Sequence, residues 1–252
     1  MNRYFIYLGY NGKPFSGWQV QPNGVTVQQC LEGALAVLFR QPVPVVGAGR
    51  TDAGVHARLM VAHFDRLEPV DDLVVLSEKL NRLLPKEIAI YRIVPVIPEA
   101  HARFDALSRT YNYYITTLKD PFDFEYTYKL HGTIDFDEMN RACEVLYEYT
   151  DFTSFSKLHT DVKTNNCRVM QAVWEPEESR WKFTIQADRF LRNMVRAIVG
   201  TLLEVGRGKM TIDGFRQVIE AKDRNRAGMS VPGQALFLTE VCYPEQLFKV
   251  EK

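Results

Sequence analysis

The stretch PVVGAGRTDAGVHARLMVAHF, residues 44–64, joins two apolar segments through a charged turn that glycines bound. The apolar runs at 44–48 and 59–64 predict two short strands, with the charged residues as their connection. Such connections often carry functional side chains. A lone Asp in a glycine turn is more often structural, because its carboxylate caps a backbone N–H. Capping explains Asp52, but it gives no reason for Arg50 and Arg58 beside it.

The elements around this stretch are predicted in the order strand, helix, strand, strand, helix, strand. Residues 3–10 alternate and are rich in aromatic side chains, which is typical of a strand. Thr26 has the position of an N-cap before the first helix, and Asp71 or Asp72 has that position before the second. Residues 87–96 alternate and predict the last strand of this half.

The second half repeats this order. Strands are predicted at 107–118, 167–174, 181–187 and 235–241, and helices at 135–149, 191–205 and 211–221. Two tandem split βαβ units are the economical interpretation, so the predicted fold class is α+β with mostly antiparallel sheets. We expect an N-terminal domain at 1–103 and a C-terminal domain at 104–252.

The composition is that of a soluble globular protein, because 46% of the 252 residues are hydrophobic and no segment is long enough to span a membrane. No signal peptide is evident, so a cytoplasmic protein is expected. The four cysteines are scattered without a Cys-x-x-Cys pair, which predicts reduced thiols and no zinc or redox centre.

The net charge is zero, with 31 Lys and Arg against 31 Asp and Glu, but the charges are unevenly distributed. Residues 121–151 hold eight acidic and two basic side chains, whereas residues 186–209 hold five basic and two acidic ones. Since neutralising RNA phosphates takes only about six to ten well-placed cations, a neutral chain with one basic face can still bind RNA.

Asp52 is the candidate nucleophile, because it combines a flexible glycine setting, an exposed strand end and nearby guanidinium groups. An adjacent arginine favours the ionised carboxylate. Arg50 could supply that charge, and so could Arg192 or Arg196, which are four residues apart in the helix predicted at 191–205. Like charges at that spacing repel, so a negative group is expected to face them. A solvated basic helix face is the alternative.

Two other patterns have competing interpretations. Tyr111 shares one strand face with Tyr113, and tyrosines there are more often packing residues, although nearby arginines favour stacking of RNA bases.

Asp52, His56 and His63 could be a metal site of a hydrolase. Their spacing along a strand does not converge as it would on a helix, and Arg50 would compete with a cation for the carboxylate.

The motif AGRTDAGVHA at 48–57 resembles the signature of the tRNA pseudouridine synthase A family. The resemblance continues with HARF at 101–104, RTYNY at 109–113, FLRNMVR at 190–196 and LFL at 236–238, and it covers essentially the whole chain. It implies an isomerase with a pseudouridine-synthase-type catalytic cleft that converts uridine to pseudouridine at positions 38, 39 and 40 of the tRNA anticodon stem-loop. The reaction needs no metal or other cofactor, and the family resemblance implies a homodimer.

The resemblance also assigns roles to residues. Asp52 is the catalytic carboxylate, Arg50 holds the target nucleotide flipped out, and Arg196 pairs with Asp52. Tyr111 lies against the uracil, and Leu238 also contacts the substrate. Candidates for phosphate contacts are Arg58, Arg103, Arg109, Arg168 and Arg192.

The chain departs from the family pattern at a few positions. The family usually has Asp where Asn11 stands, Arg in place of Thr110 or Asn112, and Gly where Ala235 stands. Loss of positive charge at 110 and 112 predicts weaker phosphate affinity there, and the Ala235 methyl group restricts the backbone. Residues 157–161 match a family loop near the tRNA.

Three hypotheses follow, and the first is favoured: a pseudouridine synthase, a non-catalytic RNA-binding module built on split βαβ units, and a metal-dependent hydrolase. Loss of activity on substitution of Asp52 separates the first from the second. Sensitivity to a chelator separates the third from both.

Overall fold

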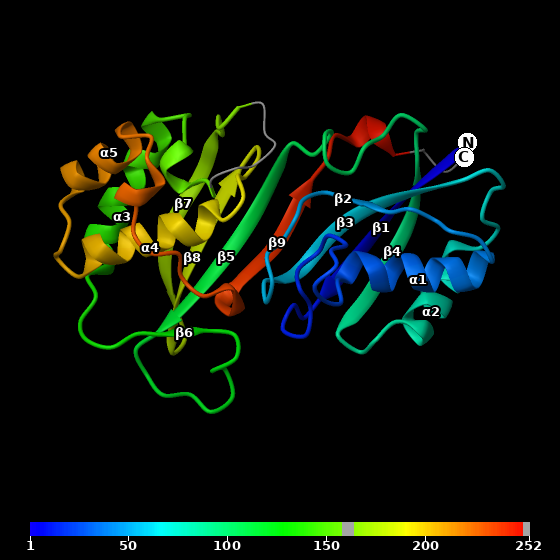
Figure 1. Ribbon diagram of the computed structural model, residues 1–252, viewed down its shortest axis with the longest axis horizontal. Coiled ribbons are helices and arrows are strands. Elements are labelled where there is room, and N and C mark those ends of the chain that lie inside the picture. The colour runs from blue at the N-terminus through cyan, green and yellow to red at the C-terminus, as the bar shows by residue number, and fades with distance from the viewer. Residues whose placement is uncertain (158–163, 249–252) are drawn as a thin grey trace. The chain divides into compact units, whose positions relative to one another are not determined.

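The structure is a computed structural model that describes residues 1–157 and 164–248. The chain divides into two compact units (Figure 1). Unit 1 contains residues 1–108 and 238–252, and unit 2 contains residues 109–237. Unit 1 is therefore discontinuous in sequence, because the C-terminal residues return to it.

Unit 1 has the predicted order of elements. They are β1 (Asn2–Tyr10), α1 (Val27–Phe39), β2 (Val46–Gly47), β3 (His56–Arg66), α2 (Leu73–Leu83) and β4 (Ile88–Val96). β1 pairs antiparallel with both β3 and β4, and β2 pairs antiparallel with β3. This arrangement is that of a split βαβ unit. Both helices lie on the same face of the sheet (Figure 1).

The predicted caps fix where the helices of unit 1 begin. The Thr26 hydroxyl accepts a hydrogen bond from the Gln29 N–H at 3.3 Å, and the Asp72 carboxylate accepts one from the Val75 N–H at 2.8 Å. Each cap satisfies an N–H that the helix itself leaves unpaired.

Unit 2 repeats the pattern. Its elements are β5 (Ser108–Thr116), β6 (Tyr128–Lys129), α3 (Phe136–Glu144), β7 (Val169–Glu177), β8 (Arg180–Ala187), α4 (Met194–Gly206), α5 (Ile212–Glu220) and β9 (Leu236–Cys242). Two of these strands cross the unit boundary: Ser108 of β5 belongs to unit 1, and β9 passes into unit 1 at Leu238. β8 pairs antiparallel with β5 and β7, and α3 contacts β7, α4 and α5 (Figure 1). The predicted α+β fold with mostly antiparallel sheets is confirmed.

Several details of unit 2 differ from the prediction. The hairpin between β7 and β8 closes through two residues, because Glu178 takes the left-handed conformation with φ 53°. The helix predicted at 135–149 ends as α3 at Glu144 and continues as a short 3₁₀ turn. The two-residue strand β6, which pairs parallel with β5, was not predicted because so short a strand has no periodicity.

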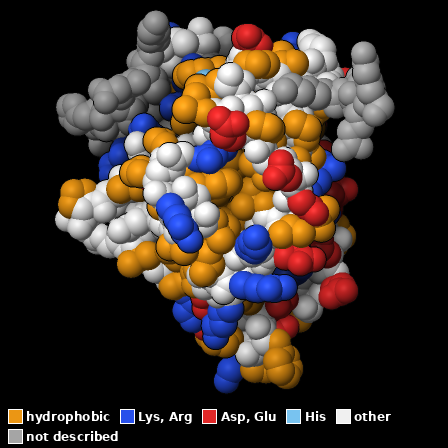
Figure 2. All heavy atoms as spheres, turned by 90° about the vertical axis from the view of Figure 1, so that its right-hand side faces the viewer, with side chains coloured by type: hydrophobic (Ala, Val, Ile, Leu, Met, Phe, Trp, Pro, Cys, Tyr) orange, Lys and Arg blue, Asp and Glu red, His pale blue; other side chains and the backbone are white. Residues whose placement is uncertain are grey.

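The core of each unit is apolar and well packed. Phe5, Phe64 and Leu31 are fully buried in unit 1, as are Trp174 and Phe183 in unit 2. Hydrophobic side chains also reach the surface between basic and acidic ones on the face that Figure 2 shows. In the described ranges, no helix is both long and apolar enough to span a bilayer.

The cysteines are free thiols. Burial raises the pKa of the Cys167 thiol to about 12 and raises the pKa values of Cys30 and Cys143 as well. The thiols of Cys30, Cys143 and Cys167 therefore stay protonated and unreactive near neutral pH.

Candidate active site

Asp52 lies in the turn that connects β2 to β3 in unit 1, where the charged stretch was predicted to lie. Its neighbours Thr51 and Val55 are buried, whereas Asp52 itself is half-buried and the Arg50 side chain is exposed. The Val55 N–H donates to the Asp52 carbonyl at 3.2 Å and closes the turn. The residues that flank Asp52 in this turn are therefore anchored in the core.

Segment 10–18, which follows β1, holds this turn through hydrogen bonds. The Tyr10 hydroxyl and the Thr51 hydroxyl share a buried hydrogen bond of 2.9 Å. The Gly12 N–H donates to Nδ1 of the buried His56 at 3.0 Å. The Trp18 N–H donates to the Thr51 carbonyl at 3.2 Å. Hydrogen bonds therefore hold the turn at Thr51 and at His56, which lie before and after Asp52 in the chain.

Two glycines allow segment 10–18 to approach the turn so closely. A Cβ at Gly12 would lie 2.0 Å from the Val55 carbonyl oxygen, and one at Gly17 would lie 2.4 Å from the Thr51 carbonyl oxygen. Gly17 also has a φ of 91°, which only glycine adopts readily. By contrast, a Cβ at Gly49 would point into open space, and the φ of Gly49 is not positive.

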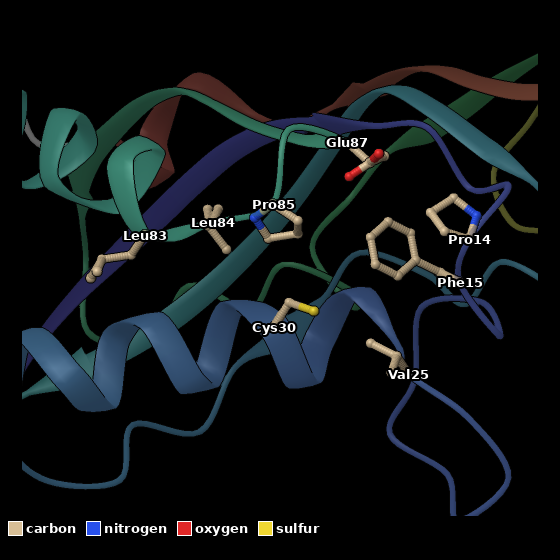
Figure 3. A pocket seen from close by; sticks show the side chains of 8 residues that line it. All are labelled: Pro14, Phe15, Val25, Cys30, Leu83, Leu84, Pro85 and Glu87. Carbon is tan, nitrogen blue, oxygen red and sulfur yellow. The ribbon is translucent and has the colours of Figure 1, made fainter.

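A cavity of about 560 Å³ lies between α1, the end of α2 and segment 10–18 (Figure 3). Its lining is mostly apolar and includes Phe15 and Cys30, with Glu87 as the charged member. The Phe15 carbonyl accepts a long hydrogen bond from the Gly54 N–H at 3.4 Å. None of the predicted site residues lines this cavity, so we assign it no role in the chemistry.

The geometry argues against the metal-site alternative. His56 and His63 lie seven residues apart on β3, which separates them by about 23 Å along the strand. Each Nδ1 accepts a backbone N–H, from Gly12 in one case and from Ala102 at 3.1 Å in the other. Across residues 1–157 and 164–248, no group of three or more His, Cys, Asp or Glu side chains is arranged to hold a metal ion.

Arg58 and Arg103 are also in unit 1, and both are exposed. Arg58 is the third residue of β3, and Arg103 lies in a turn between β4 and β5. Unit 1 thus carries four of the predicted site residues with their charged groups at or near the surface, the other two being Arg50 and Asp52. Leu238, on β9, is 1% exposed.

In unit 2, Tyr111 lies on β5 and is 8% exposed. Its ring meets that of Phe190 edge to face, with centroids 5.1 Å apart. Phe190 follows β8 and was not predicted as a site residue. The signal for it was its place at the start of the FLRNMVR motif, next to residues that were singled out for their charge.

The residue Asp188 connects two of the predicted arginines. Its carbonyl accepts a hydrogen bond from Nη1 of the Arg109 side chain at 2.8 Å, and its carboxylate accepts one from the backbone N–H of Arg168 at 2.7 Å. The Arg109 side chain is buried, whereas that of Arg168 is exposed. Sequence analysis missed Asp188, because nothing in its local pattern indicates that two distant strands meet there.

The helix that carries Arg196 begins later than predicted. α4 starts at Met194, because Asn193 takes the left-handed conformation with φ 69° and breaks the run. Arg192 therefore precedes the helix, and the argument that it repels Arg196 across one helical turn is wrong. The Arg192 side chain is exposed, and its carbonyl accepts the Lys157 N–H at 3.0 Å.

Hydrogen bonds to segment 227–232 hold both the side chain and the backbone of Arg196 within unit 2. Nε of Arg196 donates to the Val231 carbonyl at 2.7 Å, and the Val231 N–H donates to the Arg196 carbonyl at 3.2 Å. The Tyr113 hydroxyl donates to the Pro232 carbonyl at 2.9 Å. A Cβ at Gly200 would lie 1.8 Å from the Met229 carbonyl oxygen, so α4 needs glycine where the segment crosses it.

The departures from the family pattern have local roles. The Asn11 Oδ1 accepts the Lys13 N–H at 3.0 Å, and an Asp could do the same. The Thr110 hydroxyl accepts a hydrogen bond from the Gln186 amide at 3.0 Å. Ala235 is buried without a positive φ, so its backbone does not need glycine. Of the predicted loop at 157–161, residues 158–161 lie outside the described residues.

Fold and site together define an α+β protein of two split βαβ units in which a half-buried Asp lies in a turn held by hydrogen bonds. The sequence profile of the family described as tRNA pseudouridine synthase matches residues 8–105 and 148–244. A tRNA pseudouridine synthase A of Parabacteroides distasonis is 74% identical over the full length of both chains.

More distant relatives carry the same description. The tRNA pseudouridine synthase A of Bacteroides thetaiotaomicron is 62% identical, covering 100% of this chain and 94% of its own. That of a Geobacter species is 40% identical, covering 95% of this chain and 98% of its own. The chain therefore belongs to the tRNA pseudouridine synthase family, a family of isomerases.

Proposed function

We propose that this protein converts uridine to pseudouridine at positions 38, 39 and 40 of the tRNA anticodon stem-loop, with Asp52 as the catalytic carboxylate. The observation that carries the proposal is the Asp52 turn itself. It carries a half-buried carboxylate that lies in the sequence between the exposed residues Arg50 and Arg58, on a chain whose relatives are named tRNA pseudouridine synthase A. Relatives named for a tRNA substrate support tRNA as the substrate here.

The chemistry is an isomerisation in which no atom is added to the nucleoside. The C1′–N1 bond breaks, the uracil turns, and C1′ bonds to C5. The proton on C5 leaves to solvent and N1 gains a proton. A carboxylate can serve as the nucleophile: it forms a transient bond to the uracil ring or to the ribose that allows the first bond to break, and this bond breaks again as C1′ is joined to C5, which regenerates the carboxylate. The turn's hydrogen bonds limit the movement of Asp52, which keeps the reacting groups oriented.

The remaining residues have proposed roles in holding the RNA. Arg50 keeps the target nucleotide out of the stem-loop, which costs a few kcal/mol that contacts to the base offset. Tyr111 and Leu238 contact the uracil, and Arg196 pairs with Asp52 during the reaction. Phosphate contacts, which position the RNA without reading bases, are proposed for Arg58, Arg103, Arg109, Arg168 and Arg192.

Assembly and location complete the proposal. We propose a homodimer that acts in the cytoplasm, where tRNA substrates are available. The alternative of a non-catalytic RNA-binding module is retained as an outcome of the experiment below, because the two split βαβ units alone would serve either role.

The test is tritium release from C5-labelled uridine in tRNA. Asp52→Asn and Asp52→Ala are expected to abolish release and to keep most of the tRNA affinity, because both remove the reacting carboxylate and leave the proposed RNA-binding side chains in place. Asp71→Asn is the matched control, since Asp71 is exposed in the same unit. Release by either Asp52 variant would refute the catalytic role of Asp52, and a wild-type protein that binds tRNA without release would support the binding module.

Arg196→Ala is expected to lower kcat by about tenfold to a hundredfold with a smaller change in tRNA affinity, because the role proposed for its charge is in the reaction and not in holding the RNA. Single-turnover rates and binding measured side by side check this expectation. Equal losses in both would identify Arg196 as a phosphate contact instead.

A further inference from the structure

The turn at 101–105 of unit 1 is unusually well fixed for a surface turn. The Ala102 N–H donates to His63 Nδ1, and its carbonyl accepts the Tyr243 hydroxyl. The His101 N–H donates to the Asp105 carboxylate at 2.7 Å, and the Asp105 N–H donates to the His101 carbonyl at 3.0 Å. Hydrogen bonds to His63 and Tyr243 therefore hold the turn on the rest of unit 1, and hydrogen bonds between His101 and Asp105 close it.

His101 organises the outer part of the turn. Its Nδ1 accepts the N–H groups of Arg103 and Phe104 at 3.1 and 3.2 Å. Its ring lies 4.2 Å from the Phe104 ring, centroid to centroid, and 4.7 Å from the His63 ring. Burial is the main cause that lowers the pKa of both histidines, to about 4 for His63, so both rings are neutral acceptors near neutral pH.

The side chains that this turn presents are those of Arg103 and Phe104. Phe104 is 75% exposed although His101 covers part of its ring. The Arg103 guanidinium lies 5.8 Å from the centre of the Phe104 ring, within reach of a cation–π contact. The charge of Asp105 is directed into the turn by its bond to the His101 N–H.

We propose that Arg103 and Phe104 form a stacking platform for an unpaired base of the RNA substrate, separate from the nucleotide that reacts. This inference rests on the proposed function. Proteins that bind single-stranded RNA commonly combine an exposed aromatic ring with a guanidinium group, because a base stacks on the ring and the cation faces the phosphate. The fixed turn supports this role, since a platform that is already ordered loses little entropy on binding.

The experiment measures binding of two synthetic RNAs, a hairpin with an unpaired loop and a fully paired duplex of the same length. Phe104→Ala and Phe104→Leu are expected to weaken hairpin binding roughly tenfold and to leave duplex binding unchanged, because only the loop offers an unstacked base. Phe104→Trp should bind the hairpin like wild type, and the hairpin should quench its fluorescence beyond the quenching seen in wild type.

Phe122→Ala is the matched control, since Phe122 is 87% exposed in unit 2 and has no proposed role. It should bind both RNAs like wild type. His101→Asn keeps an acceptor for the two N–H groups and should lose less hairpin affinity than His101→Ala.

Three outcomes would overturn the platform: unchanged hairpin binding in Phe104→Ala, equal loss for hairpin and duplex, or a change in the oligomeric state of Phe104→Ala by light scattering. The last would identify Phe104 as a protein contact. Because the readout is binding, it does not depend on turnover. If Asp52→Asn retained activity while Phe104→Ala lost hairpin affinity, the catalytic assignment would fail and the platform would stand.

Discussion

Two turns of unit 1, the Asp52 turn and the 101–105 turn, are each held by a hydrogen bond to a buried histidine, at different ends of strand β3. His56 and His63 both lie on β3, both are buried, and each accepts a backbone N–H at Nδ1. The surroundings differ. The Asp52 turn depends on close approach of backbone at Gly12 and Gly17, whereas the 101–105 turn has no glycine and depends on side-chain hydrogen bonds.

The two turns should therefore respond differently to substitution and to pH. Backbone packed against backbone cannot adjust to an added Cβ, so the Asp52 turn should fail on small steric changes. A turn fixed by imidazole and carboxylate groups should instead respond to pH, because protonation removes the acceptor.

Gly17→Ala should lower the free energy of unfolding by more than about 2 kcal/mol, since the new Cβ meets the Thr51 carbonyl at a φ that disfavours any side chain. Thermal unfolding measures the change. Gly49→Ala, in the β2–β3 connection that carries Asp52 but with open space around it, should change stability by less than about 1 kcal/mol. Equal effects at both glycines would contradict the backbone-packing account.

The 101–105 turn should lose stability in mild acid through His63. Its pKa in the folded protein is about 4, below the ordinary 6.5, so between these values the unfolded chain binds a proton that the folded protein does not. Stability is therefore full above pH 6.5 and falls as the pH drops towards 4, by at most about 2 kcal/mol between pH 7 and pH 5 from this group.

Denaturant titrations of wild type and His63→Asn across this range isolate the contribution of His63, because Asn keeps an acceptor for the Ala102 N–H and does not titrate. The variant should show the weaker pH dependence. Parallel stability curves for the two proteins would count against His63 as the titrating group.

His56→Ala should lower kcat roughly tenfold at saturating tRNA with little change in KM, because the Asp52 turn loses its link to Gly12 and the carboxylate is less well oriented. His56→Asn keeps an acceptor near Nδ1 and should recover most of the rate. His63→Asn is the control and should leave kcat unchanged. If His56→Asn were as slow as His56→Ala, the imidazole would have a part in proton transfer.

Much of this protein is determined by the sequence alone, where the signal is local. The caps at Thr26 and Asp72 fixed helix starts because a side-chain oxygen three residues before an N–H suffices to form the bond. The alternating strands and the order of elements were sufficient for the split βαβ fold. The motif around Asp52 identified the candidate site and the family before any geometry was known.

Tertiary structure alone decided what depends on residues distant in the chain. The meeting of Arg109 with Asp188, the left-handed Asn193 that shortens α4, and the approach of Gly12 to His56 leave no periodic trace in the sequence. Hydrogen bonds between segments form only once the sheets have brought their backbones together, and a local pattern carries no information on which segments these are.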